Sequence, residues 1–207
     1  RPSVGVTIDN QFKGAGIRTA NSTYEVQIAG RGAVPSNAAA VVMNLTVTGS
    51  TGGGFATVYP CGTQPGTSSA NWTTGLTRPN ELIVKLSPTG SVCVFVSAAT
   101  HVILDVAGYL PPTQGYTPIT PARLVDTRTG KASIDGLQVG DGVRPNGNVY
   151  QVQVAGRGGV PLNATTAAIN VSVIAASGGY LTVYPCGELP TASSLNFATG
   201  NVRPNEL

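Results

Sequence analysis

The chain has 207 residues, only 10% of them charged, and a formal net charge of +3 at pH 7. Its 12 lysines and arginines stand apart instead of clustering, which argues against a nucleic-acid-binding surface. No apolar run approaches the ~20 residues that a membrane-spanning helix needs, so no transmembrane segment is expected. The 27 glycines and 15 prolines, together with many β-branched residues, favour short strands and tight turns over helices.

An internal repeat dominates the sequence. The stretch "YEVQIAGRGAVP" at residues 24–35 returns as "YQVQVAGRGGVP" at residues 150–161, which is 126 positions later. After a one-residue deletion the offset becomes 125, so that "RPNEL" occurs at residues 78–82 and again at 203–207. The sequence therefore predicts a tandem duplication. We call residues 1–112 the first segment and residues 113–207 the second segment.

The alignment of the two segments also predicts that each is incomplete. "RLVDTR" at residues 123–128 has no full counterpart before residue 1, and residues 83–110 have none after residue 207. We therefore expect the first segment to lack its N-terminal strand and the second to lack its C-terminal strands. The proline-rich residues 111–121 between them are expected to form an extended spacer.

Apolar alternation along the chain predicts antiparallel strands. In residues 41–48, alternate positions are apolar and are expected to face the core, namely Val41, Met43, Leu45 and Val47. Residues 92–96 and 101–110 are apolar on both faces, which predicts central strands. Glycine-rich residues 50–54 and 177–179 indicate hairpin loops. With about eight strands per segment, the expected fold is all-β, a tandem pair of antiparallel β-sandwich or barrel-like domains.

The two "GRG" sequences at residues 30–32 and 156–158 resemble phosphate-binding loops only superficially. Neither is followed by the Lys-Ser/Thr pair of such a loop, and no helical pattern follows. A tight turn with positive φ at glycine is the better prediction.

Three cysteines indicate a disulfide. Cys61 follows a strand-like "TVYP" and Cys93 lies in the apolar "SVCVFVS" of the same segment, whereas Cys186 matches Cys61. We expect a Cys61–Cys93 disulfide and a partner for Cys186 beyond residue 207. The alternative is a pair of buried free thiols in a cytosolic protein. The low charge and loop-rich composition favour an oxidising, extracellular setting.

Catalytic and metal-binding chemistry finds little support in the sequence. His101 is the only histidine, and it stands at the start of an apolar strand, where we expect it to be partly buried. Asp105 within that strand is expected to be satisfied by an arginine or by backbone N–H groups. Asp126 and Arg128 are expected to form a turn cap and an ion pair. We therefore predict no enzyme activity, no cofactor and no metal.

Trp72 and Phe197 occupy equivalent positions in "NWTTG" and "NFATG". Aromatic rings at repeated positions have two interpretations. They can plug the core or anchor an edge, or they can contact sugars through their faces.

The motifs "RLVDTR", "VAGRGGVP", "AINVSV", "GYLTVYPCG", "SSLNFATG" and "SVCVFVSAATHVILDVAGYL" together resemble a repeat of about 125 residues found in secreted and cell-surface proteins of Actinobacteria and Chloroflexi-type bacteria. The resemblance implies an extracellular β-rich module, often in tandem or attached to a hydrolase or adhesin. It brings no catalytic residues. The "RPNEL" stretches depart from it, since the family pattern is more apolar there.

These observations predict a non-enzymatic extracellular structural or adhesive repeat protein that forms a cell-surface stalk, layer or filament. Its expected partners are further copies of itself or neighbouring repeats. The alternative is a carbohydrate- or cell-wall-binding module of a larger secreted protein, with cell-wall polysaccharide as its partner.

Overall fold

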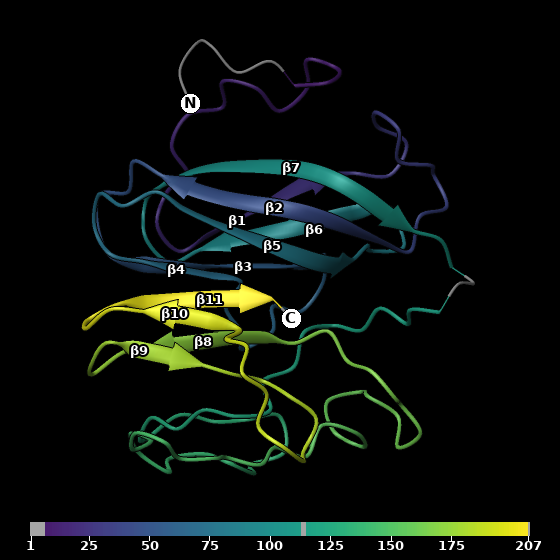
Figure 1. Cartoon of the computed structure of the whole chain (residues 1–207). Helices are drawn as coiled ribbons and strands as arrows, with labels where there is room; N and C mark the ends of the chain where they lie inside the picture. The colour runs from purple at the N-terminus through teal and green to yellow at the C-terminus, as the bar shows by residue number, and fades with distance from the viewer. Residues whose placement is uncertain (1–6, 113–114, 207) are drawn as a thin grey trace.

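The computed structural model describes residues 7–112 and 115–206, and within them every regular element is a β-strand (Figure 1). All pairs of named strands are antiparallel. The prediction of an all-β protein is confirmed. The segment bounds placed at residues 1, 113 and 207 lie outside the described residues.

The first segment forms two sheets. Its described strands are β1 (Ser22–Gln27), β2 (Ala40–Thr48), β3 (Gly54–Pro60), β4 (Ala70–Trp72), β5 (Arg78–Lys85), β6 (Ser91–Val96) and β7 (His101–Leu110). One sheet has the strand order β1-β6-β3-β4 and the other the order β5-β2-β7. The sequence predicted about eight strands per segment with the N-terminal one absent from the first segment, and residues 7–112 contain seven.

One hydrophobic cluster draws side chains from both sheets. From β2 it takes the predicted inward residues Val41, Met43, Leu45 and Val47, each 0% exposed. From β6 it takes Val92, Val94 and Val96, none more than 1% exposed. The alternation in β2 therefore predicted its buried face correctly. Removing such large apolar side chains from water stabilises the fold by about 1.5–3 kcal/mol each.

Strands β6 and β7 show that apolar composition alone does not locate a strand within a sheet. β6 lies between β1 and β3 and is buried on both faces, as predicted. β7 was also predicted to be central, and this is wrong, because it pairs with β2 alone at the edge of its sheet. Val106 and Tyr109 of β7 are 40% and 46% exposed.

The glycine-rich residues 50–54 and 177–179 are not hairpin loops, which corrects the sequence prediction. Residues 50–54 carry the chain from β2 in one sheet to β3 in the other. A Cβ atom on Gly54 would lie 2.8 Å from the Cβ of Ala98. Glycine therefore allows the backbone at residue 54 to lie close to Ala98, at the point where the chain passes from one sheet to the other. The physical reason for the error is that glycine marks a tight connection without specifying the sheet that follows.

The second segment contains β8 (Asn170–Ile174), β9 (Gly179–Leu181), β10 (Leu195–Phe197) and β11 (Val202–Glu206). β8 pairs with β11 in the register of β2 and β5, since Val173 is opposite Arg203 as Val47 is opposite Arg78. β9 pairs with β10 in the register of β3 and β4, with Gly179 opposite Phe197 as Gly54 is opposite Trp72. Similar sequences thus form the same local pairings.

Both "GRG" turns have the backbone conformation that the sequence predicted. Gly30 and Gly32 have φ of 79° and 55°, and Gly156 and Gly158 have φ of 82° and 57°. Residues with a Cβ rarely adopt this left-handed conformation, so glycine is required at these corners.

The two segments contact each other through strands. β11 of the second segment packs against β4 and β5 of the first, and Figure 1 shows the yellow β11 directly beneath β4. β4 and β5 are the edge strands of their sheets, so the contact covers two edges at once.

Candidate functional site

The predicted disulfide is present. Cys61, just after β3, is bonded to Cys93 in β6, and their Cα atoms are 4.9 Å apart. The register explains the pairing, since Tyr59 lies opposite Cys93 and Pro60 opposite Val92. The bond closes a loop over a sequence separation of 32 residues and links the end of β3 to β6, the neighbouring inner strand of its sheet.

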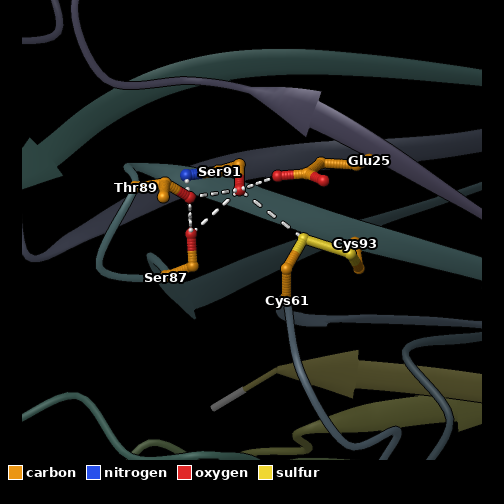
Figure 2. Close-up of a disulfide and its surroundings, with 6 residues drawn as sticks. All are labelled: Glu25, Cys61, Ser87, Thr89, Ser91 and Cys93. Atoms are coloured by element: carbon orange, nitrogen blue, oxygen red, sulfur yellow. Dashed lines mark hydrogen bonds between the residues drawn. A yellow bond between two sulfur atoms is a disulfide. The ribbon is translucent and has the colours of Figure 1, made fainter.

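A cluster of hydroxyl groups surrounds this disulfide (Figure 2). The fully buried Ser91 donates a hydrogen bond to Oε1 of Glu25 at 2.6 Å, and its Oγ lies 3.5 Å from Sγ of Cys61. Ser87 and Thr89 exchange hydrogen bonds with Ser91 and with each other. The cluster therefore fixes the turn between β5 and β6 next to the disulfide.

The cluster was missed in the sequence because its members are ordinary turn residues. "SPTGS" at residues 87–91 signals a turn between two apolar strands, but nothing in it points to Glu25, which is 66 positions away from Ser91. Pairing of β1 with β6 brings Glu25 opposite Cys93. Only strand order could have revealed this proximity.

Glu25, Cys61 and Cys93 place one carboxylate oxygen and two sulfurs within 4.8 Å of one another. In the disulfide form the two sulfurs are bonded to each other, so they are not thiolates, the form in which cysteine binds metals. What remains is one exposed carboxylate hydrogen-bonded to a hydroxyl. The disulfide links β3 to β6, and the carboxylate of Glu25 is the single group of the three that could bind a metal ion.

A groove of about 630 Å³ opens beside the disulfide, between loops of the first segment and the spacer. Its lining includes Cys61, Lys85, Pro88, Pro112 and Pro118. Lys85 is the one charged side chain among its lining residues. The other polar side chains of the lining are hydroxyls and one amide, and this combination does not specify a ligand.

The two aromatic residues proposed as sugar contacts have different environments. Trp72 is 3% exposed within the hydrophobic core, and its Nε1 donates a hydrogen bond to the carbonyl of Gly52 at 3.0 Å. Its ring faces are therefore covered by protein, which contradicts a sugar contact there and favours a core plug. Phe197 is half-buried and lies beside Gly179 of the neighbouring strand.

His101 and Asp105 both lie on β7. His101 begins the strand and is half-buried, as expected. Asp105 is exposed, opposite Asn44 of β2. Because β7 is an edge strand, water reaches this carboxylate, and the expectation that a partner must compensate its burial is wrong.

Asp126 is the buried carboxylate of the second segment. It is 8% exposed and accepts hydrogen bonds from the backbone N–H of Arg128 at 3.2 Å and from its Nε at 2.9 Å. Arg123 adds an ion pair at 3.1 Å. The Arg128 guanidinium lowers the pKa of Asp126 below its usual value. The predicted turn cap and ion pair are both present.

Each "GRG" arginine anchors its turn through an aspartate. Arg31 pairs with Asp9, and Arg157 pairs with Asp135, each at 2.6 Å. The hydrogen bond from Arg31 lowers the pKa of Asp9 to about 2, and Arg157 lowers the pKa of Asp135 in the same way. These pairs hold loops together, and the sequence analysis missed them because the partners are 22 positions apart.

No protein-family model, curated protein or solved structure matches the chain significantly. Among the described residues, none forms a helix long and apolar enough to cross a membrane.

Proposed function

We propose that this chain is a non-enzymatic structural or adhesive protein of the extracellular surface, built from tandem β-sandwich repeats. The observation that carries the proposal is the direct strand contact between the two segments. A protein that transmits force or builds a layer needs repeats that hold one another, in addition to a linker that joins them.

The contact between the segments involves backbone groups of edge strands. Oε1 of Glu206 in β11 accepts a hydrogen bond from the N–H of Ile83 in β5 at 2.7 Å. Nδ2 of Asn170 in β8 lies 3.4 Å from the carbonyl oxygen of Ser68, just before β4. Exposed sheet edges invite pairing with foreign strands. Covering them with the next segment protects the edges and joins the units.

The proposal of two repeats draws on recurring hydrogen bonds. The N–H of Val58 donates to Oγ of Ser69 at 2.9 Å, and the N–H of Val183 donates to Oγ of Ser194 at 3.0 Å. Both pairs are related by the offset of 125 seen in the sequence. The sandwich assignment draws on the single hydrophobic cluster shared by the two sheets of the first segment.

The extracellular location draws on the disulfide and on composition. Structural disulfides persist mainly in oxidising environments. A chain with 10% charged residues and a stapled core suits a stiff, protease-resistant surface array.

Electron microscopy and multi-angle light scattering of the purified chain over a range of concentrations test this function. We expect ordered polymers or layers whose spacing matches the segments. A Glu206→Ala/Asn170→Ala variant should reduce their order, whereas Glu188→Ala, at an exposed loop position, should not. A chain that stays monomeric at every concentration and is retained on cell-wall polysaccharide would instead support the carbohydrate-binding alternative.

A further inference from the structure

Three side chains that can bind a metal ion meet on one sheet of the first segment. Pairing of β1 with β6 places Glu25 directly opposite Cys93, and Cys61 follows β3, the strand on the other side of β6. One carboxylate oxygen of Glu25 and the two sulfurs lie within 4.8 Å of one another. Directly opposite residues on neighbouring strands point to the same face. The sheet itself therefore brings these three groups together.

The strands keep the two cysteines close without help from the bond between their sulfurs. β6, which carries Cys93, is paired on both sides, and Pro60, the residue before Cys61, lies opposite Val92. The Cα atoms of the two cysteines are 4.9 Å apart. In a tetrahedral zinc site two thiolate sulfurs lie about 3.8 Å apart, which follows from a Zn–S distance of about 2.3 Å. Rotation of the two side chains gives this separation once the sulfurs are no longer bonded.

The Glu25 carboxylate is already oriented beside the sulfurs. Ser91 donates a hydrogen bond to its Oε1 at 2.6 Å, and Figure 2 shows the Ser91 hydroxyl linked to both the carboxylate and the sulfur of Cys61. A carboxylate has two oxygens and several lone pairs, so it can accept this hydrogen bond and bind an ion at the same time. A hydrogen bond of this kind orients a metal ligand and increases its affinity.

The negative charge of Glu25 is not needed for the hydrogen bond with Ser91. Gln151 stands at the matching position of the second segment, and the amide oxygen of a glutamine accepts the same kind of hydrogen bond. A carboxylate differs from that amide in its charge, which attracts a divalent cation. The second segment therefore supplies the natural control for this position.

Solvent reaches the group from two directions. Glu25 is exposed, and Cys61 is half-buried and lines the groove of about 630 Å³ beside the disulfide. Gly62 and Thr63 continue the groove wall from Cys61. A small reductant can reach the sulfur of Cys61 through this groove, and a metal ion can follow the same path.

We propose that reduction of the Cys61–Cys93 disulfide creates a zinc site, in which the two thiolates and the Glu25 carboxylate bind one Zn²⁺ ion and a water molecule completes a tetrahedron. Two sulfurs and one carboxylate suit zinc, whereas magnesium and calcium prefer sites made of oxygen atoms alone. Such a site adds a redox-dependent metal-binding activity to the proposed structural role.

The redox step needs a thiol reductant such as glutathione. The S–S bond breaks, and the two cysteine sulfurs take two electrons and two protons from two thiols of the reductant, which leave as one disulfide. Zinc then displaces the two protons from Cys61 and Cys93, because cysteine binds metals as the thiolate.

Zinc titration of the full chain tests the proposal, with Cys186→Ser as the background so that no third thiol takes part. A phosphine reduces the disulfide and becomes its oxide, with oxygen and two protons supplied by water. In competition with a chromophoric chelator, the reduced chain should bind one Zn²⁺ ion and the oxidised chain none. Zinc uptake by the oxidised chain equal to that of the reduced chain would overturn the proposal.

Glu25→Gln separates a site that includes the carboxylate from simple zinc capture by two thiols. This variant keeps an acceptor for Ser91 and copies the residue of the second segment, so its fold should be unchanged. We expect its zinc affinity to fall at least about tenfold, since even the loss of an outer partner of a metal ligand costs this much. Glu188→Gln, which changes an exposed carboxylate elsewhere, should bind zinc as tightly as the background chain. Equal affinities for Glu25→Gln and Glu188→Gln would refute the site.

X-ray absorption at the zinc edge measures the ligands directly. The spectrum of the reduced, zinc-loaded chain should contain two sulfur neighbours at about 2.3 Å and oxygen neighbours at about 2.0–2.2 Å. A spectrum without sulfur neighbours would contradict the proposal. Trp72 fluorescence reports whether the reduced chain stays folded. If reduction unfolds the chain, zinc should restore the folded signal, because metal binding adds to folding stability. Absence of this recovery would also overturn the proposal.

Discussion

The carboxylate of Glu206 accepts a hydrogen bond from the backbone N–H of Ile83, and this contact joins the two segments across a sheet edge. Burial raises the pKa of Glu206 to about 7, against a lowering by the Ile83 hydrogen bond, and the charge of Glu81 raises it further. Burial therefore favours the neutral form of Glu206 in the folded chain, although the hydrogen bond from Ile83 by itself favours the charged form.

This shift gives the contact a definite pH dependence. The folded pKa lies above the unfolded value of 4.5, so the folded chain holds more protons between these values and its stability falls as pH rises from about 4.5 to about 7. Because the site is partly exposed, we expect a loss on the order of 1 kcal/mol. Glu206→Gln keeps an acceptor for Ile83 and should remove this part of the slope. Urea unfolding at pH 5 and pH 8 measures it.

The control for this prediction is Glu188→Gln, because Glu188 is exposed and lies outside the contact. It should keep the slope of the unchanged protein. Equal slopes for the Glu206→Gln variant and the unchanged protein would show that Glu206 does not titrate with the contact. Tyr116, whose pKa is raised by burial and then by the Glu206 charge, ionises above this range.

The disulfide should contribute a large part of the stability of the first segment. A loop of 32 residues corresponds to about 3–4 kcal/mol in the chain-entropy model. Cys61→Ala/Cys93→Ala should lose this amount in urea unfolding followed by the fluorescence of Trp72, the single tryptophan. Cys186→Ser should change the curve by less than about 0.5 kcal/mol, as expected for an exposed side chain. A small loss in the double variant would contradict the assignment.

The all-β fold class and the Cys61–Cys93 disulfide could be predicted from the sequence. The fold class follows from the local pattern of apolar residues, and the disulfide follows from comparison of the two segments. Alternation in β2 identified Met43 and Leu45 as core residues, and the unequal numbers of cysteines in the two segments identified Cys61 and Cys93. Sheet membership was not accessible, because hydrogen bonding between distant strands leaves no local signature. For this reason β7 was placed at the centre and residues 50–54 were assigned to a hairpin.

The contacts near the disulfide show the same limit. Ser91 and Glu25 are unremarkable in the sequence, and they meet only because β1 and β6 pair. Trp72 illustrates a different limit, since an aromatic residue at a repeated position suits a core and a binding face equally well. Burial decides between them, and burial depends on the whole fold.

Trp72 should therefore matter for stability and not for polysaccharide retention. Trp72→Ala removes a large side chain from the core and leaves the Gly52 carbonyl without its indole donor, so we expect a loss of about 3–5 kcal/mol. Phe197→Ala should cost less, because Phe197 is half-buried. Circular dichroism during urea unfolding measures both. A pull-down on cell-wall polysaccharide should give equal retention for all folded variants, and a selective loss with Trp72→Phe would restore the sugar-contact interpretation.

A matched pair of asparagines tests whether the first segment is more tightly closed than the second. Asn80 is 6% exposed, and its Nδ2 donates to the carbonyl of Ser69 at 2.8 Å, which ties β5 in one sheet to the chain entering β4 in the other. Asn205 makes the matching bond to Ser194 at 3.0 Å but is only half-buried. An orphaned buried carbonyl costs about 1–3 kcal/mol, whereas water can replace the donor where the site is open.

Asn80→Ala should therefore lose about 1–3 kcal/mol and Asn205→Ala well under 1 kcal/mol. Trp72 fluorescence reports the first change, and hydrogen exchange of residues 194–206 reports the second. If residues 83–110 are appended after residue 207, the second segment should close, and the cost of Asn205→Ala should rise towards that of Asn80→Ala. Equal losses of stability for Asn80→Ala and Asn205→Ala in the chain of 207 residues would contradict this prediction. They would mean that burial at the two sites does not control how much each hydrogen bond contributes to stability.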